Sequence, residues 1–385
     1  MPETSEAVGA GEGGERGGAG AAPRKAHRYR CPGCAADLEF APRDGLLVCP
    51  YCGRSEPVAA SGRAVEERSY EDYLRLHADR LGTLAEGALE VGCDSCGALV
   101  TFAPPLVAGE CDFCGARIVA QPKAADPILA PEGVLPFRVT ADEAARAVGL
   151  WIAALWFAPN ALKRLASHEE MGGVYIPFWT FDTHADTAYE GRRGDYYYEE
   201  EVYTAHDTQG NAERRTRQVR QTRWSPVSGR LSRWFDDITV PATRSLPARH
   251  LEALEPWEMS ALVAYEPAYL VGFKAQRYQV GLAEGFELAK GMAARRIESD
   301  VRRDIGGDLQ VITKIDTRYT AVTFRHVLLP VHVGAYRFGD RVYQVVVNGR
   351  TGEVQGDRPY SFWKIFFLVL FLLAATALGV LLSAG

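Results

Sequence analysis

The sequence lacks the short motifs that mark common catalytic sites. It contains no P-loop, no G-x-S-x-G and no dinucleotide-binding fingerprint between a strand and a helix. Its 385 residues begin without the apolar run that a signal peptide needs. A formal net charge of −6 excludes a chain that coats nucleic acid through bulk positive charge. The spacing of residues identifies no catalytic set of a nucleophile, a base and an orienting group, so we expect no enzymatic activity.

Charge is missing from the C-terminal stretch as well. Residues 365–385 carry no charged side chain. At about 1.5 Å rise per residue, a helix of this length measures about 30 Å, the thickness of a bilayer core. We therefore predict one transmembrane helix over 361–385. We expect lipid contacts from Trp363, Ile365, Phe366 and Leu382.

The charges beside this stretch predict its orientation. Arg350, Arg358 and Lys364 precede it and no basic residue follows it. Basic residues flank membrane spans on the cytoplasmic side. We therefore predict a single-pass protein of the cytoplasmic membrane with its N-terminus in the cytoplasm.

Cysteine is absent from residues 1–30 and 115–385 and concentrated between them. All eight cysteines fall in two copies of one pattern, in which fourteen residues separate two C-x-x-C pairs. The first copy holds Cys31, Cys34, Cys49 and Cys52, and the second holds Cys93, Cys96, Cys111 and Cys114. Every cysteine is offset by 62 from its counterpart, and the Phe-Ala-Pro at 40–42 recurs at 102–104. The pattern is therefore an internal duplication.

Paired C-x-x-C turns at this separation are typical of a four-cysteine zinc ribbon, because each turn directs two thiolates at one tetrahedral metal. The intervening residues have the length of a short hairpin, with Phe40 or Phe102 covering the site and Gly53 permitting close backbone approach. Disulfides are the alternative, which a cytoplasmic location disfavours. Thioredoxin-like chemistry would need a C-x-x-C beside a βαβ unit. We predict two structural zinc ions, one in each copy.

These signals divide the chain into seven segments. We predict a disordered tail over 1–26, a first ribbon over 27–57, a helical spacer over 58–90, a second ribbon over 91–120, a linker over 121–136, an α+β domain over 137–360 and the membrane helix over 361–385. The spacer places Tyr70, Tyr73 and Leu74 on one helical stripe, which we expect to pack on a ribbon. The predicted fold class is α+β, with two small ribbons and one transmembrane helix.

Within the α+β domain, Thr140 and Glu143 form a capping box that predicts a helix ending near Leu155. Further helices are predicted over 160–170, 248–257 and 281–305. Period-two patterns predict strands over 174–181, 309–315, 319–328, 331–337 and 341–347, and a long hairpin over 195–203 and 213–224. These strands favour antiparallel sheets.

One arm of the predicted hairpin is acidic and the other is basic. The acidic residues are Glu199, Glu200 and Glu201, and the basic residues are Arg214, Arg215, Arg217, Arg220 and Arg223. Cross-strand charge pairing inside the hairpin is the interpretation we favour. A patch that binds anionic lipid or nucleic acid is the alternative.

A few other polar residues are candidates for a site. Asp182, His184 and Asp186 alternate along a strand, where we expect a polar face, with metal ligation as the alternative. His326 and His332 flank a Leu-Leu-Pro segment, and we expect structural roles for both.

Several motifs resemble those of a known family. They are Val174-Tyr-Ile-Pro-Phe-Trp179, Val240-Pro241, Leu254-Glu-Pro256, Tyr269-Leu-Val-Gly-Phe273, Leu328-Leu-Pro-Val331 and Val347-Asn-Gly-Arg-Thr-Gly352. In this order, after two complete ribbons, they resemble bacterial zinc-ribbon membrane proteins labelled as containing transcription-factor-IIB-type ribbons or as primosomal protein N′ (replication restart helicase)-like. The resemblance implies a role beside phage-shock-protein A and SPFH-domain proteins, which such family members accompany in envelope-stress gene clusters. Helicase activity does not carry over, because the Walker A loop is missing.

The leading functional prediction is a non-enzymatic adaptor or scaffold. Its zinc ribbons would present a rigid surface to a protein partner, and its C-terminal helix would hold that surface at the cytoplasmic face of the membrane. The alternative is a membrane-tethered ribbon protein that binds nucleic acid in replication or transcription, since residues 24–54 carry a modest excess of basic residues. An enzyme of unrecognised type in the α+β domain is the third possibility.

Overall fold

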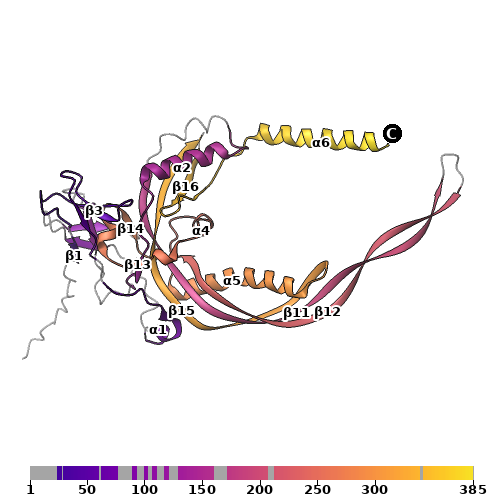
Figure 1. Ribbon diagram of the computed structural model, residues 1–385, viewed down its shortest axis with the longest axis horizontal. Coiled ribbons are helices and arrows are strands. Elements are labelled where there is room, and N and C mark those ends of the chain that lie inside the picture. Colours follow the sequence, from indigo (N-terminus) through magenta and orange to yellow (C-terminus); the bar gives the residue numbers. More distant parts are fainter. Residues whose placement is uncertain are drawn as a thin grey trace, which may run out of the picture.

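The computed structural model describes residues 24–27, 29–59, 62–76, 89–92, 99–102, 106–110, 117–120, 129–159, 171–206, 212–338 and 341–384. These residues form a mixed α+β structure, as the sequence predicts (Figure 1). The predicted helix over 160–170 lies outside them.

Three long antiparallel strands form the centre of the fold. They are β11 (Gly172–His206), β12 (Ala212–Pro241) and β15 (Leu309–Phe338), with β11 in the middle. The β11–β12 hairpin pairs from Phe178↔Pro241 out to His206↔Ala212, so the predicted hairpin is confirmed and is much longer than its sequence signal. Its far end projects from the body as an arm (Figure 1).

β15 is one strand where the sequence pattern predicts three. Its pairing with β11 continues across both predicted breaks, with register shifts between Asp182 and His184 and between Glu190 and Gly191. Such bulges shift the alternation of side chains without ending the strand. The predicted breaks at 316–318 and 329–330 pair with β11 without a register shift, so the interruptions of the apolar pattern there do not end the strand.

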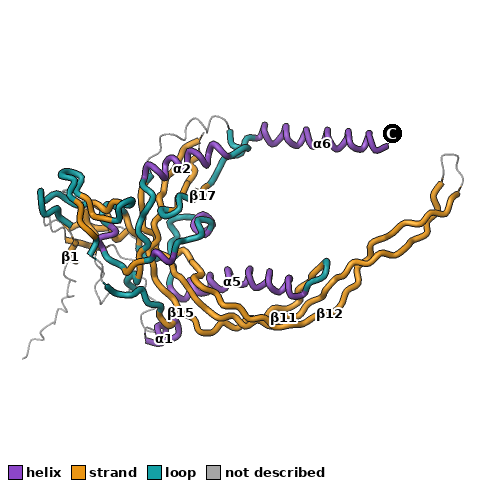
Figure 2. The backbone as a smooth tube through the Cα atoms, viewed as in Figure 1, coloured by secondary structure: helices purple, strands orange, loops and turns teal. Residues whose placement is uncertain are grey.

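The helix α5 (Leu282–Ile305) lies along the inner side of this curved sheet (Figure 2). It buries one stripe, made of Phe286, Ala289, Ala293, Ile297 and Val301. That stripe joins the largest cluster of buried apolar residues together with strand residues of β11, β12 and β15. The sequence predicts this helix and its apolar side correctly except for Leu288, which is exposed.

Shorter elements complete the body. They are β10 (Gly133–Val134), α2 (Ala141–Ala154), α4 (Ala248–Glu252), η1 (Met259–Ala261), β13 (Val263–Ala264), η2 (Pro267–Leu270), β14 (Lys274–Gln276), β16 (Arg341–Asn348) and β17 (Val354–Gly356). Both halves of the predicted capping box at Thr140 and Glu143 are present. β10 and Glu132 pair with the body inside the segment predicted as a linker, which moves the start of the α+β unit upstream.

The helix α1 (Tyr70–Leu76) follows β5 (Arg68–Ser69) and packs on the body. Tyr70 lies 4.7 Å from the ring of Phe286, and Tyr73 lies 5.2 Å from Phe324, measured between ring centroids. The prediction that this helix packs on a ribbon is therefore wrong. Its aromatic stripe matches the apolar surface of α5 and β15 instead.

The N-terminal strands form two groups. β2 (Glu39–Ala41), β3 (Leu46–Val48) and β4 (Ser55–Pro57) make a separate three-stranded sheet. β1 (Arg24–His27), β6 (Leu89–Gly92), β7 (Leu99–Phe102), β8 (Leu106–Glu110) and β9 (Arg117–Ala120) join the large sheet through β14. β1 begins at Arg24, inside the segment predicted as a tail over 1–26, and residues 1–23 lie outside the described residues.

The chain ends in α6 (Phe362–Ala384), which leaves the body as an isolated helix (Figure 1). Of the residues that the structure describes, no helix combines the length and the apolar character needed to cross a membrane. The prediction of a transmembrane helix, which was part of the predicted fold class, is therefore wrong.

Candidate metal centre

The first cysteine copy forms two tight turns of the same construction. In one, the Cys31 N–H donates to Ala36 O (2.7 Å) and the Ala35 N–H donates to Cys31 O (2.8 Å). In the other, the Cys49 N–H donates to Arg54 O (2.8 Å) and the Gly53 N–H donates to Cys49 O (3.0 Å). Ala35 and Gly53 occupy the same place in the two turns.

Both of these residues have left-handed backbone, with φ of 59° at Ala35 and 71° at Gly53. A Cβ added to Gly53 would meet no atom within 4 Å. The left-handed backbone angle is therefore one reason for glycine here, and the predicted close approach of the backbone to the metal stays a prediction. Ala35 adopts the same conformation at a cost that glycine avoids.

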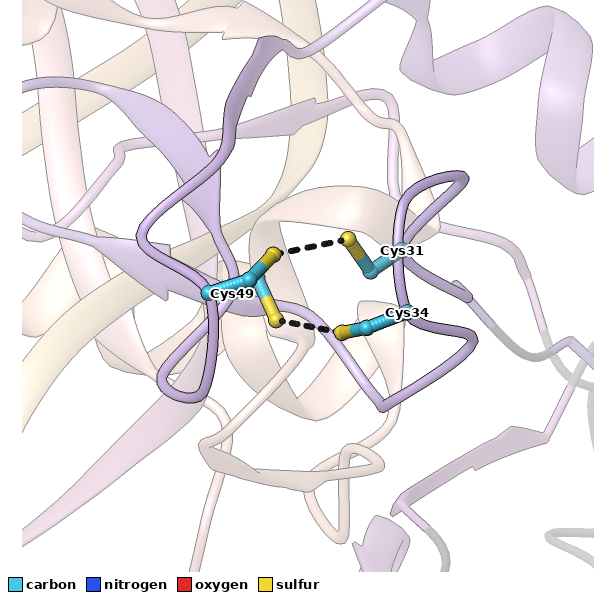
Figure 3. Close-up of side chains that lie close together, drawn as sticks. Cys31, Cys34 and Cys49 are labelled. Atoms are coloured by element: carbon cyan, nitrogen blue, oxygen red, sulfur yellow. Dashed lines mark hydrogen bonds between the residues drawn. The ribbon is translucent and has the colours of Figure 1, made fainter.

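The two turns bring four sulfur atoms together (Figure 3). Cys31 Sγ lies 3.5 Å from Cys52 Sγ, and Cys34 Sγ lies 3.4 Å from Cys49 Sγ. All four lie within 4.8 Å of one another. With Zn–S bonds of about 2.3 Å, a tetrahedral site has sulfurs about 3.8 Å apart. The four predicted ligands of the first copy are thus assembled at the separation that one zinc ion requires.

The site combines buried and exposed sulfurs. Cys31 and Cys49 are buried, whereas Cys34 and Cys52 are exposed. The backbone N–H of Gly33 points at Cys31 Sγ, 3.4 Å away. Hydrogen bonding from the backbone of Cys52 lowers the pKa of the Cys49 thiol to about 7, against the raising effect of burial. Amide donors that favour thiolate also favour metal binding, since the thiolate is the ligand.

A short segment of the body holds this ribbon in place. Phe40 is 4% exposed, and its ring lies 5.4 Å from that of Tyr269 and 6.5 Å from that of Phe273. The Phe40 N–H donates to Val271 O at 3.1 Å. Phe40 thus joins the ribbon to the body. The sequence reasoning singled out the motif at 269–273 without a role, and its aromatic residues were the available signal.

The second cysteine copy is described only at its strands. Cys93, Cys96, Cys111 and Cys114 lie outside the described residues, as does Phe102's side chain. Two strand pairs flank these cysteines, β6–β7 and β8–β9. β1, which leads into the first copy, pairs with β6 and with β9 of the second. The two copies are therefore joined by backbone pairing.

The flanking pairs of the second copy repeat those of the first. In the first copy, Arg30 pairs with Asp37 and Val48 pairs with Ser55 around the two cysteine turns. At an offset of 62, the second copy pairs Gly92 with Leu99 and Glu110 with Arg117. The strands thus enter and leave both cysteine pairs in the same register.

The other predicted candidates do not form a metal site among the described residues. A bulge at Asp182 breaks the expected common face: Asp182 is buried and accepts from the Asp237 N–H, whereas His184 pairs with Asp186 at 3.4 Å. His326 is buried and its Nδ1 lies 3.0 Å from Leu129 O. Burial lowers the pKa of His326 to about 4, which fits a neutral structural residue.

His332 is buried as well, with its Nε2 2.8 Å from Val139 O. Burial lowers the pKa of His332 too. Both histidines therefore hold segments of the body together, as the sequence analysis expected.

At the start of α6, the predicted lipid-contacting residues are exposed. Trp363, Ile365 and Phe366 have exposed fractions of 65%, 39% and 44%, and the side chain of Leu382 lies outside the described set. Lys364 donates to Trp156 O and Ala158 O at 3.1 and 2.8 Å, which fixes the first turn of α6 to the segment after α2. Trp156, 79% exposed, adds a further aromatic ring at this end.

Comparison with known proteins gives one relative of comparable length. The chain is 26% identical over 345 residues to YdjG, an uncharacterized protein of Bacillus subtilis (strain 168). The similarity covers 88% of this chain and 91% of YdjG, so it is not confined to the ribbons. No protein-family model and no solved structure gives a significant match.

Proposed function

We propose that this protein is a non-enzymatic adaptor that presents a protein-binding surface on zinc ribbons at the cytoplasmic face of a membrane. The observation that carries the proposal is the four-sulfur cluster of the first copy. Four thiolates complete the coordination of zinc and leave no position for water or substrate, so such a metal stabilises a fold. The ribbon around it is firmly docked, which suits a surface presented to a partner.

The proposal includes a second structural zinc ion, bound by Cys93, Cys96, Cys111 and Cys114. The support is the shared register of the strands that flank both cysteine copies, together with the identical cysteine spacing. A chain of this kind gains folding free energy from each metal that it binds.

The proposed partner of α6 is membrane lipid. Its described side chains are apolar on every side, and those from Phe366 to Leu373 have exposed fractions between 41% and 68%. Leaving this surface in water costs about 25 cal/mol per Å². Trp156, Tyr360 and Trp363 are exposed near the start of α6, and aromatic rings of this kind favour the boundary between lipid and water.

The proposed protein-binding surface includes the tip of the second cysteine turn. Tyr51 lies there between Cys49 and Cys52 and is 82% exposed. Tyrosine is enriched at protein interfaces, and here the turn that carries it is fixed by the metal site. The resemblance noted above suggests a partner similar to phage-shock-protein A or to SPFH-domain proteins, which makes this an adaptor in an envelope-stress system.

Co-purification tests this proposal. The full chain, extracted from membranes in detergent after cross-linking, should retain a protein partner, and Tyr51→Ala should lose it while keeping its zinc. Lys274→Ala, an exposed substitution on β14, serves as the matched control. Failure to recover any partner, or equal recovery with Tyr51→Ala, would contradict the proposed surface. Salt-dependent binding of DNA or RNA by the chain would favour the nucleic-acid alternative.

A further inference from the structure

The arm contains a segment with two open strand edges. β15 pairs with β11 only as far as Leu309↔Gly194, and the Asp308 carboxylate accepts from the Tyr196 N–H at 2.7 Å. Beyond that point, residues 197–206 of β11 and 212–221 of β12 form a ribbon of two strands, which we call the distal arm. Among the described strands, β12 pairs with β11 alone.

A two-stranded ribbon is marginally stable by itself in water. No helix covers the distal arm in the described structure (Figure 1). Its exposed apolar residues include Tyr198 at 63% and Val202 at 57%. Unpaired N–H and C=O groups along an edge are a template for another strand. The distal arm therefore has the backbone and the surface to accept one.

The two edges of the distal arm carry opposite charge. The β11 side has Glu199, Glu200 and Glu201 and no Lys or Arg, whereas the β12 side has four arginines and a single acid, Glu213. The four arginines are Arg214, Arg215, Arg217 and Arg220. All of these side chains are exposed. Each edge is thus complementary to the other edge of an identical arm.

Pairing inside the hairpin uses only part of this charge. Arg217 forms an ion pair with Glu201 at 2.7 Å, and Arg215 forms one with Glu213 at 3.0 Å. In the part of the chain that the structure describes, Glu199 and Glu200 form no ion pair, and neither do Arg214 and Arg220. The Arg220 guanidinium lies 4.3 Å from the centre of the Tyr196 ring, a contact that leaves its positive charge unneutralised. Among the described residues of the distal arm, two carboxylates on one edge and two guanidiniums on the other can therefore still pair with charges of a neighbouring strand.

We propose that the distal arm joins copies of this chain to one another, with the β12 edge of one copy pairing with the β11 edge of the next. Pairing two β12 edges would place arginines opposite arginines, and pairing two β11 edges would place glutamates opposite glutamates. Like charges directly opposite across strands destabilise a sheet. The contact is therefore head to tail, and it builds a ring or an open chain of copies and not a twofold dimer.

Charge-reversal variants of the full chain test this inference. The wild-type protein in detergent, followed by sedimentation velocity at low salt, should contain particles with several copies. E199K/E200K/E201K makes both edges basic, and R214E/R215E/R217E/R220E makes both acidic, so each variant alone should be a single copy. A mixture of the two variants should assemble again, because each then supplies the edge that the other lacks.

Three controls separate this result from other causes. E66K/E71K/E287K changes the same charge at exposed positions outside the arm and should assemble like the wild type. Unchanged zinc content and circular dichroism exclude unfolding of the variants. Assembly should weaken at about 0.5 M salt, where surface charges are screened over a few Å. A wild-type protein that is a single copy at every salt, or variants that assemble alone, would overturn the inference.

Discussion

Exchanging the residues in the left-handed positions of the two cysteine turns should change zinc affinity in opposite directions. In Gly53→Ala, the new Cβ meets no atom, so the only cost is the left-handed backbone with φ of 71°. That cost is about 1 kcal/mol. Because zinc binding is coupled to folding of the ribbon, the same free energy appears in the binding constant as about a fivefold loss. Ala35→Gly removes the equivalent strain and should tighten binding several-fold.

Competition with a chromophoric chelator at fixed pH measures both effects on the full chain. Gly352→Ala is the matched control, because Gly352 also has a positive φ (80°) and open space but lies between β16 and β17, outside the ribbon. It should leave the zinc affinity unchanged. If Gly53→Ala binds zinc like the wild type, or if Ala35→Gly binds it more weakly, the assignment of strain to these two turns is refuted.

Two further predictions concern the body. The fully buried Asn348 donates to Leu254 O and accepts from the backbone N–H groups of Arg350 and Thr351. At about 1 kcal/mol for each hydrogen bond, Asn348→Ala should lower the free energy of unfolding by about 3 kcal/mol, measured by chemical denaturation. An unchanged denaturation midpoint would contradict this. Burial raises the pKa of Asp182 to about 7 next to Glu67, Asp237 and Arg325, so its contribution to stability is complete below about pH 4 and is lost as the pH rises through about 7. Asp182→Asn keeps an acceptor for the Asp237 N–H but does not titrate. The free energy of unfolding of this variant should therefore fall less between about pH 5 and pH 8 than that of the wild type. An equal fall in both proteins would show that Asp182 does not cause this pH dependence.

The elements with strong local signals could be predicted from the sequence. The capping box at Thr140 placed the start of α2, and the apolar stripe of α5 identified its buried side. The cysteine spacing identified four residues that the structure brings within 4.8 Å. In each case the determining interactions connect residues close in the sequence, or residues of one fixed motif.

The predictions that failed depend on interactions between residues far apart in the sequence. The three strands predicted over 309–337 are one because β11, more than a hundred residues away in sequence, continues to pair through both predicted breaks. The aromatic stripe of α1 was correctly read as a packing surface, but its partners Phe286 and Phe324 are over two hundred residues away. Asp182 left the expected polar face because of a bulge that no alternation pattern reveals.

The C-terminal prediction failed for another reason. A run without charge indicates apolar character, but crossing a membrane requires sufficient length and sufficient apolar character in the same helix. α6 begins at Phe362, as expected, and among described residues no helix meets the requirements for crossing a membrane. What the structure retains of that prediction is an exposed apolar surface, and its interaction with lipid stays a prediction.

The zinc content of the purified full chain tests the central claim most directly. Native mass spectrometry should detect two zinc ions per chain, one of which is lost in Cys49→Ser and the other in Cys111→Ser. Retention of one zinc ion by each variant would assign the metals to separate cysteine copies. A chain that carries no zinc, with its cysteines free or oxidised, would contradict the account.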